Sequence, residues 1–139
     1  MLQIDVARVV PVSLSDVALR AYAAEVVRVT KTKRQVASRE LSVAFVGPQR
    51  MRTVNRGYHG EDRVTDVLAF SGAPESFGEI LICPAYVRQQ AKKAKEPVRR
   101  EMVRVFVHGV LHLLGYDHAV PEDAERMFRI QEAVVRTSA

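Results

Sequence analysis

Hydrophobic and polar positions along the chain follow two periods, and these periods predict its strands and helices. Leu41, Val43 and Phe45 alternate with Ser42 and Ala44, which is the period of a half-buried strand. In other stretches, apolar residues three and four positions apart predict helices. We therefore expect strands over residues 2–10, 41–45, 67–70 and 79–83, and helices over 13–30, through 51 and 54, and over 84–95, 97–114 and 121–136.

Capping and turn residues separate these elements. Ser13 with Asp16 resembles a capping box at the first helix. Prolines stand where three later helices begin, at Pro84, Pro97 and Pro121. The expected connections are a basic segment over 31–39, a loop over 57–64, a turn over 71–74 and a frayed tail over 137–139. With no repeat or long linker, the pattern predicts one α+β domain over residues 1–139, a four-stranded sheet packed with about five helices.

Composition places the chain among globular proteins. It has 139 residues, of which 47% are hydrophobic, enough for a genuine core. The single cysteine, Cys83, cannot form an internal disulfide, which suggests a reducing compartment. The first residues lack the basic start and apolar run of a secretory signal, and no apolar run approaches the roughly 20 residues of a membrane helix. We therefore expect a cytoplasmic protein with no membrane partner.

Positive charge gathers in three groups of residues. The net charge is +5, and a basic surface favours a polyanionic partner such as nucleic acid. Aromatic residues are spread along the chain and tryptophan is absent, so a platform that stacks RNA bases is not indicated. The groups are Lys31, Lys33, Arg34 and Arg39; Arg50, Arg52, Arg56 and Arg63; and Arg88, Lys92, Lys93, Lys95, Arg99, Arg100 and Arg104.

Three of the 4 histidines lie close together in the sequence. His108 and His112 are spaced so that on a helix they lie one above the other, and His118 follows Gly115, which is well placed to end that helix. The apolar stripe of the helix lies on roughly the opposite side, so the imidazoles should face a cleft or solvent. Three neutral nitrogens with one open position are the ligand set of a catalytic zinc site, here at the end of a long helix.

The same spacing matches the metzincin peptidase motif H-E-x-x-H-x-x-G-x-x-H. The position after the first histidine holds Gly109, not the glutamate that serves as general base in those peptidases, which weakens the peptidase hypothesis. A three-histidine zinc can still lower the pKa of a bound water and polarise a phosphoryl oxygen. A basic surface would concentrate a phosphodiester substrate. These features predict a metal-dependent hydrolase with an anionic substrate.

The histidine stretch also resembles a family signature. His108-Gly-Val-Leu-His112-Leu-Leu-Gly115-Tyr116-Asp117-His118 is similar over its whole length to H-G-x-L-H-L-x-G-Y-D-H of the YbeY family of bacterial endoribonucleases. Residues 54–70 resemble the family segment L-N-x-x-Y-R…P-T-D-V-L-S-F, and residues 78–80 resemble its G-D-I. The similarity covers roughly residues 40–135.

The resemblance implies a fold, a cofactor and an activity. It implies a compact α+β domain with one zinc ion per chain, held by His108, His112 and His118. It further implies a cytoplasmic endoribonuclease specific for single-stranded RNA, acting in maturation of the small-subunit ribosomal RNA 3′ end and in ribosome quality control. The implied partners are single-stranded RNA, ribosomal RNA and the small ribosomal subunit.

The chain departs from the family pattern next to the tyrosine. Where the family has an arginine, this chain has His59. The role of that arginine in contacting RNA could pass to Arg56, to Arg63 or to a protonated His59.

The residues leave the cleavage chemistry open. Asp117 is a candidate catalytic base, although a structural role, accepting a hydrogen bond from a ligand imidazole or from the backbone, fits it better. Glu101 lies on the histidine side of the helix, where a solvated ion pair with Arg104 is expected. Either water or the 2′-hydroxyl of RNA could attack the phosphate. The metal could be nickel in place of zinc. An alternative function is that of a ribosome-binding assembly factor whose metal is structural.

Overall fold

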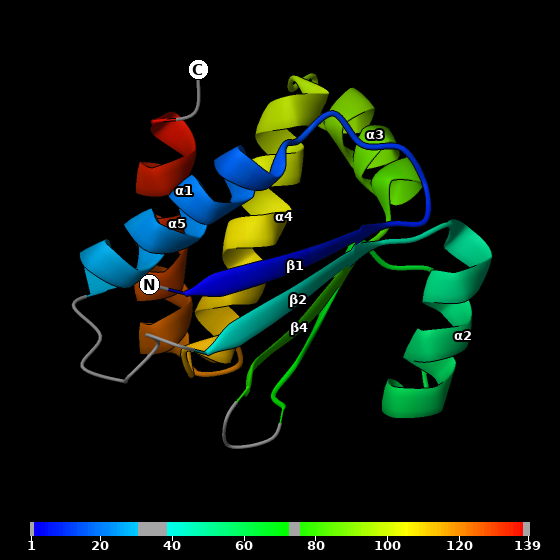
Figure 1. The fold of residues 1–139 in the computed structure, drawn as a ribbon, viewed down its shortest axis with the longest axis horizontal. Coiled ribbons are helices and arrows are strands. Elements are labelled where there is room, and N and C mark those ends of the chain that lie inside the picture. The colour runs from blue at the N-terminus through cyan, green and yellow to red at the C-terminus, as the bar shows by residue number, and fades with distance from the viewer. Residues whose placement is uncertain (1, 31–38, 73–75, 138–139) are drawn as a thin grey trace.

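Four strands form one sheet in the order β1-β2-β4-β3 (Figure 1). The computed structural model describes residues 2–30, 39–72 and 76–137. Within them, the strands are β1 (Gln3–Arg8), β2 (Glu40–Phe45), β3 (Val67–Phe70) and β4 (Ser76–Ile82), and the helices are α1 (Asp16–Thr30), α2 (Pro48–His59), α3 (Pro84–Ala94), α4 (Val98–Leu113) and α5 (Pro121–Arg136). This confirms the predicted α+β class.

The sheet is mixed, and its edge strand β3 borders helix α4. Strands β1, β2 and β4 run parallel, while β3 pairs antiparallel with β4 from Val67↔Ile82 to Phe70↔Glu79. The parallel pairs require crossovers, and α1 supplies the one between β1 and β2. Helix α4 packs on both β3 and β4, so the edge of the sheet and the end of this helix can form a common cleft.

The two faces of the sheet carry different helices. Leu41, Val43 and Phe45 of β2 belong to the main core under α1, α3, α4 and α5. The opposite face packs against α2 in a second, smaller cluster, which includes Met51 of α2 and against which Leu81 of β4 packs. Figure 1 shows α2 on the far side of the strands from α1, α4 and α5. Alternating side chains of the strands therefore serve two layers of helices.

Helix α4 is buried on nearly all sides, because α1, α3 and α5 surround it on the sheet. The expectation of a solvated Glu101–Arg104 pair on its histidine side is wrong. The pair exists at 3.3 Å, but the Glu101 side chain is 10% exposed and that of Arg104 is 20% exposed. The reason is that α5 covers this side of α4 and binds Arg104 through Glu132.

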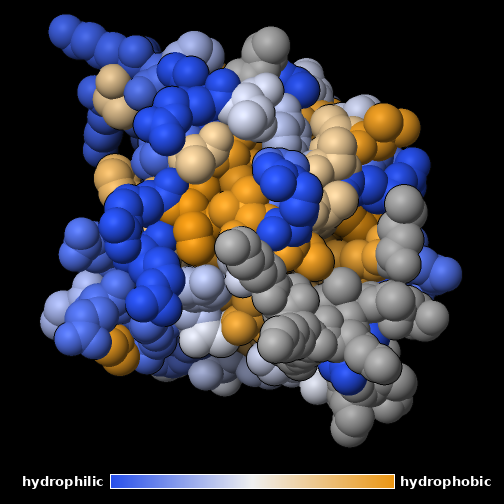
Figure 2. Space-filling view, turned by 90° about the vertical axis from the view of Figure 1, so that its left-hand side faces the viewer, coloured by the Kyte–Doolittle hydropathy of each residue, from blue (hydrophilic) through white to orange (hydrophobic). Residues whose placement is uncertain are grey.

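The surface on the α1 side combines hydrophobic and hydrophilic regions. Hydrophobic surface lies in the middle of this face, and hydrophilic side chains surround much of it (Figure 2). Among the described helices, none is long and apolar enough to cross a membrane.

Several element boundaries differ from those expected. Helix α1 is capped by Ser15, whose Oγ accepts a hydrogen bond from the Ala18 N–H at 3.1 Å, and not by Ser13. Helix α2 continues through Gly57 to His59, because the rings at its end pack on Phe70. Strand β4 begins three positions earlier than predicted, at residue 76. The predicted basic connector, hairpin turn and frayed tail fall largely outside the described residues, which omit 31–38, 73–75 and 138–139.

Gly78 allows α4, β3 and β4 to meet closely beneath the histidines. Its φ of 147° lies where side chains are rarely tolerated, and an added Cβ would lie 2.7 Å from Leu113 Cδ2 and 2.7 Å from the Phe70 carbonyl oxygen. The carbonyl oxygen is backbone and cannot move alone. Only glycine satisfies the strand geometry and the helix contact together.

We expect Gly78→Ala to lower the free energy of unfolding by at least about 2 kcal/mol, from backbone strain and overpacking. Gly57→Ala is the matched control, since its Cβ would meet no atom within 4 Å and alanine gains up to about 1 kcal/mol in a helix. Urea denaturation followed by circular dichroism measures both. A Gly78→Ala midpoint equal to that of wild type would contradict the close contact.

Candidate metal centre

Helix α4 carries two of the clustered histidines, and the turn after it carries the third. His108 and His112 lie one turn apart near the end of α4. Gly115 follows with φ 99°, which glycine adopts without strain, and the chain turns back. As a result His118 Nδ1 lies 3.1 Å from His112 Nε2, which lies 3.0 Å from His108 Nε2. The structure brings the three predicted histidines together.

The three ring nitrogens fit a shared divalent cation. The candidate ligand atoms lie within 4.8 Å of one another. Tetrahedral bonds of about 2.0–2.1 Å hold two imidazole nitrogens about 3.3 Å apart, close to the 3.0 and 3.1 Å found here. Among the described residues, no fourth histidine, cysteine or carboxylate joins the group. Three protein ligands are typical of a catalytic site, whereas a structural site has four.

Hydrogen bonds behind the centre fix the tautomer of His108. Gln131 of α5 places Oε1 2.9 Å from His108 Nδ1, and its Nε2 donates to Glu132 Oε2 at 3.2 Å. A carboxylate only accepts, so the amide nitrogen faces Glu132 and the amide oxygen faces the imidazole. His108 therefore donates from Nδ1 and keeps the lone pair of Nε2 directed at the other histidines.

Arg104 holds this chain of hydrogen bonds in place. Its guanidinium donates to both carboxylate oxygens of Glu132, at 2.8 and 3.0 Å, and to Glu101 at 3.3 Å. The hydrogen bond from Arg104 lowers the pKa of Glu132 below its usual 4.5, and the hydrogen bond to Glu132 raises the pKa of Arg104. Glu132 and Arg104 thus stay charged at neutral pH, and the carboxylate that orients Gln131 has a fixed position.

His112 is held in its neutral form. Burial lowers its pKa, and repulsion from His108 and His118 lowers it further, against a hydrogen bond to the Tyr116 backbone and the charge of Asp117, which raise it. The unprotonated imidazole is the form that binds a metal ion. The contact with Tyr116 also orients the ring from behind.

Asp117 shapes the turn that carries His118. Its Oδ1 accepts a hydrogen bond from the Ala119 N–H at 2.9 Å, and its carbonyl oxygen accepts one from the Val120 N–H at 3.1 Å. It does not line the cavity in front of the histidines. This is the backbone-holding role that the sequence favoured for Asp117.

An open cleft of about 630 Å³ lies in front of the histidines, between α4, β3 and the segment that joins α2 to β3. Of the candidate RNA contacts, His59 and Arg63 line this cleft. Arg56 does not; it lies on the exposed side of α2, 3.8 Å from Asp62. The structure therefore brings two of the three candidates to the histidine cluster.

Two polar residues that the sequence did not single out build the cleft wall. Asn55 is only 4% exposed, and its Nδ2 donates to the Arg63 carbonyl oxygen at 2.9 Å. Asp66 accepts hydrogen bonds from the Val67 N–H at 2.7 Å and from Gln90 Nε2 at 3.2 Å. These contacts hold the loop that presents Arg63 to the cleft.

The positions of Asn55 and Gln131 in the sequence indicate that both side chains are buried. Each stands four positions after a buried methionine, Met51 in α2 and Met127 in α5, where an amphipathic helix repeats its apolar side. A polar residue at such a position needs a buried hydrogen-bond partner. Asn55 finds a backbone carbonyl and Gln131 finds a histidine.

Among the basic residues that the structure describes, only those of one group border the cleft. It is the second, on α2 and the following loop, from which Arg63 reaches the lining. The third group lies on α3 and the start of α4, and Arg99 is about 20 Å from His112 at 1.5 Å per helical residue. Arg104 belongs to the half-buried ion pairs described above and not to a basic surface.

Gly109 faces the sheet at close range. A Cβ at this position would lie 3.1 Å from Cδ1 and 3.2 Å from Cγ2 of Ile80 in β4. A glutamate there would push the helix away from the strand before it could act on a substrate. The peptidase hypothesis is therefore weakened by packing as well as by the missing carboxylate.

The chain is similar to known proteins along most of its length. A family model described as Endoribonuclease YbeY matches residues 8–139. Relatives named Endoribonuclease YbeY include one from Thermotoga neapolitana, 38% identical over 74% of this chain and 70% of its own, and one from Bdellovibrio bacteriovorus, 39% identical over 73% and 69%. The solution structure of a Thermotoga maritima protein matches with a TM-score of 0.62 at 27% identity, covering 97% of this chain and 87% of that one.

We expect Gln131→Met to weaken the binding of zinc to the histidine cluster by roughly 10- to 100-fold, because His108 loses the acceptor that fixes its tautomer. Competition with a chromogenic chelator measures the affinity. Gln90→Met is the matched control, since Gln90 binds Asp66 and no histidine. Equal affinity in Gln131→Met and wild type would show that the amide does not orient His108.

We expect Glu132→Gln to lower the free energy of unfolding at pH 7 by about 1–3 kcal/mol. Because the pKa of Glu132 is lowered in the folded protein, its carboxylate stabilises the fold above its ordinary pKa, and this contribution is lost as pH falls through the folded value. The difference in the free energy of unfolding between wild type and Glu132→Gln should therefore become smaller below about pH 4.5. Urea titrations at several pH values measure it, with exposed Glu125→Gln on the same helix as control; a gap independent of pH would contradict the ion pair.

Proposed function

The chain belongs to the endoribonuclease YbeY family, and from this premise we propose that it is a zinc-dependent endoribonuclease that cleaves single-stranded RNA. It acts, in this proposal, as a single cytoplasmic domain over residues 1–139 on ribosomal RNA of the small subunit, in 3′-end maturation and ribosome quality control. The observation that carries the proposal is the trio of imidazole nitrogens at 3.0 and 3.1 Å beside an open cleft.

His108, His112 and His118 would hold one zinc ion. Bound there, the ion supplies a Lewis acid for a phosphoryl oxygen and lowers the pKa of a water molecule. The chain itself orients the ligands through Gln131 and the Tyr116 backbone. The absence of a fourth ligand among the described residues supports a catalytic role over that of a structural metal in an assembly factor.

Cations of the cleft would bind the phosphates of the RNA. Arg63 lines the cleft and lies 2.9 Å from Glu61 at an exposed position, so a phosphate can replace this weak surface pair. His59 lines the cleft where the family has an arginine. We assign Arg56, outside the lining, to a more distant phosphate.

Among the described residues, the cleft lining holds two carboxylates, Glu61 and Asp66, and Glu61 pairs with Arg63. Asp117 is engaged in its own turn, and Asp66 accepts hydrogen bonds at both carboxylate oxygens. RNA carries its own nucleophile, the 2′-hydroxyl, whose attack leaves a 2′,3′-cyclic phosphate and a 5′-hydroxyl. Attack by water leaves a linear phosphate and a hydroxyl. Mass spectrometry of the cleaved ends distinguishes the two.

We expect His108→Ala and His112→Ala to lower cleavage of a single-stranded RNA by at least about 100-fold, because either change leaves two ligands for the ion. Gel analysis of a labelled oligonucleotide measures the rate, and elemental analysis measures zinc per chain. We expect zinc in the wild-type protein and its loss from both variants. Nickel in the wild-type protein would show that the native metal is nickel and not zinc.

The control for this experiment is Lys93→Ala, an exposed change on α3 that is purified in the same way. It should cleave as wild type does. Equal cleavage by wild type and both histidine variants would point to a contaminating nuclease and refute the proposal. Circular dichroism confirms that each variant is folded.

A further inference from the structure

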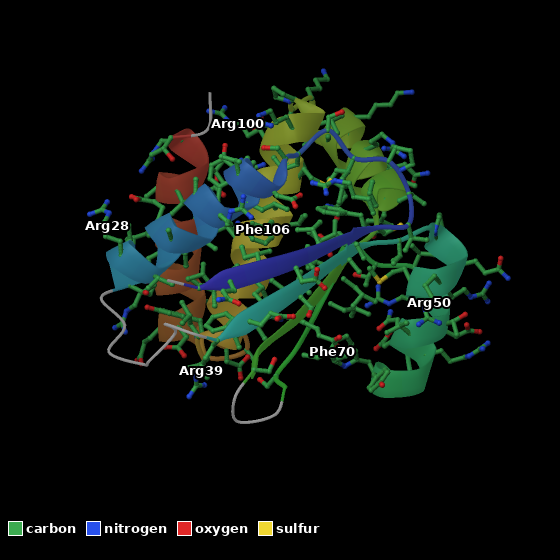
Figure 3. The ribbon with its side chains drawn as sticks, in the orientation of Figure 1. Arg28, Arg39, Arg50, Phe70, Arg100 and Phe106 are labelled. Atoms are coloured by element: carbon green, nitrogen blue, oxygen red, sulfur yellow. The ribbon has the colours of Figure 1, made fainter. Side chains whose placement is uncertain are left out.

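Three side-chain rings meet beside the histidine cleft, two from the end of α2 and one from β3, the element that follows it. Phe70 of β3 lies between the sheet and α2 (Figure 3). The ring of Tyr58 packs on it with centroids 5.0 Å apart, and the ring of His59 stacks on it at 5.9 Å with an interplanar angle of 22°. Tyr58 nevertheless remains 75% exposed. We call these three rings the aromatic ledge.

The ledge separates two adjoining hollows of the surface. His59 lines the histidine cleft on one side. Tyr58 and Phe70 line a second groove of about 760 Å³ on the other, over the sheet face that α2 covers only in part. Ala69 and Ser71 line both hollows. A chain molecule in the cleft can therefore continue across the ledge into the groove.

The charges of the groove suit a nucleotide. Arg50 extends from α2 (Figure 3) and forms no ion pair with any other described residue, whereas Arg52 lies 2.8 Å from Asp62. An arginine that has no ion pair among the described residues offers a contact for a phosphate, and the rings in the same lining offer a contact for a base. Glu79, also in the lining, can accept hydrogen bonds from the exocyclic amino group of a base.

We propose that the aromatic ledge is a stacking subsite for an unpaired RNA base, next to the nucleotide that is cleaved. The scattered aromatic residues of the sequence did not indicate such a site, because its rings meet only in the fold. The inference rests on the proposed function and extends it. An unpaired base stacks on the open face of Tyr58, and the flanking phosphate binds Arg50. A base within a duplex is already stacked and paired, so it cannot occupy the ledge. The subsite is thereby a physical source of preference for single strands.

An apolar peptide is the other molecule that would fit a groove of this kind. A nucleotide is favoured by Arg50, which pairs with no carboxylate in the described part of the chain, and by the continuity of the groove with a cleft proposed for RNA. A peptide would need no cation in the groove, so its binding would not depend on Arg50. Substitution of Arg50 therefore tests which of the two the groove binds.

The experiment measures binding to protein without metal, so that cleavage does not interfere. The probe is a single-stranded RNA oligonucleotide with one 2-aminopurine, whose fluorescence reports stacking. We expect Tyr58→Ala to weaken binding by about 5- to 100-fold, the effect of losing one stacked base, and to abolish the fluorescence change. Tyr58→Phe should retain both, and Arg50→Gln should weaken binding and reduce its salt dependence.

Phe128→Ala is the matched control, because Phe128 is an aromatic residue of α5 that is 61% exposed and lies outside both hollows. It should bind the probe as wild type does. Tyr58→Ala is not expected to disturb the fold, since the ring is mostly exposed. Binding by Tyr58→Ala within twofold of wild type, or no binding by wild type, overturns the subsite.

Cleavage assays with metal restored separate this inference from the proposed function. A subsite contact raises KM in Tyr58→Ala more than it lowers kcat. If wild type binds with the stacking signal but cleaves nothing, the nuclease proposal fails and the subsite stands. If wild type cleaves and Tyr58→Ala cleaves with the same KM, the subsite fails alone.

Discussion

The close approach of α4 to the sheet is the constraint on which the rest of the structure depends. Gly109 faces Ile80, and Gly78 faces Leu113, at distances that leave little room for a further side-chain atom. The two contacts fix both the height of the helix above β4 and its position along the strand. They thereby determine where the last turn of α4 opens beside β3, and the cleft forms at that point. The position of the histidines therefore depends on two glycines that have no reactive side chain.

A row of polar residues, here called the file, lies along the side of α4 that faces α5. Glu101, Arg104 and His108 lie on this side, and Gln131 and Glu132 of α5 meet them. Among the described residues, no buried side-chain nitrogen or oxygen lacks a hydrogen-bond partner, so the file is fully satisfied. A satisfied network of this kind is rigid, and it transfers that rigidity to the imidazole at its end. Helix α5 therefore forms part of the site, although it contributes no histidine.

Much of this arrangement could be predicted from local sequence, and the remainder depends on contacts between distant segments. The periodicity indicated every strand and helix among the described residues, and the spacing of His108, His112 and His118 indicated that they meet. Local patterns carry no information on strand order, so the insertion of β4 between β2 and β3 was not predictable. The partner of Gln131 depends on how α5 packs on α4, and the meeting of Tyr58 with Phe70 depends on how the end of α2 lies against β3. The burial of Glu101 likewise required knowledge that α5 covers α4.

The contact between Gln131 and His108 also bears on how the chain acquires its site during synthesis. The three clustered histidines precede α5 in the chain. During synthesis they are therefore made before Gln131, whose side-chain amide orients His108. Until α5 docks, Arg104 has no Glu132 and the apolar residues of α4 lack part of their cover. Alignment of the three imidazoles is thus coupled to the synthesis and docking of α5, and a chain that stops short of α5 carries the histidines without the scaffold that aligns them.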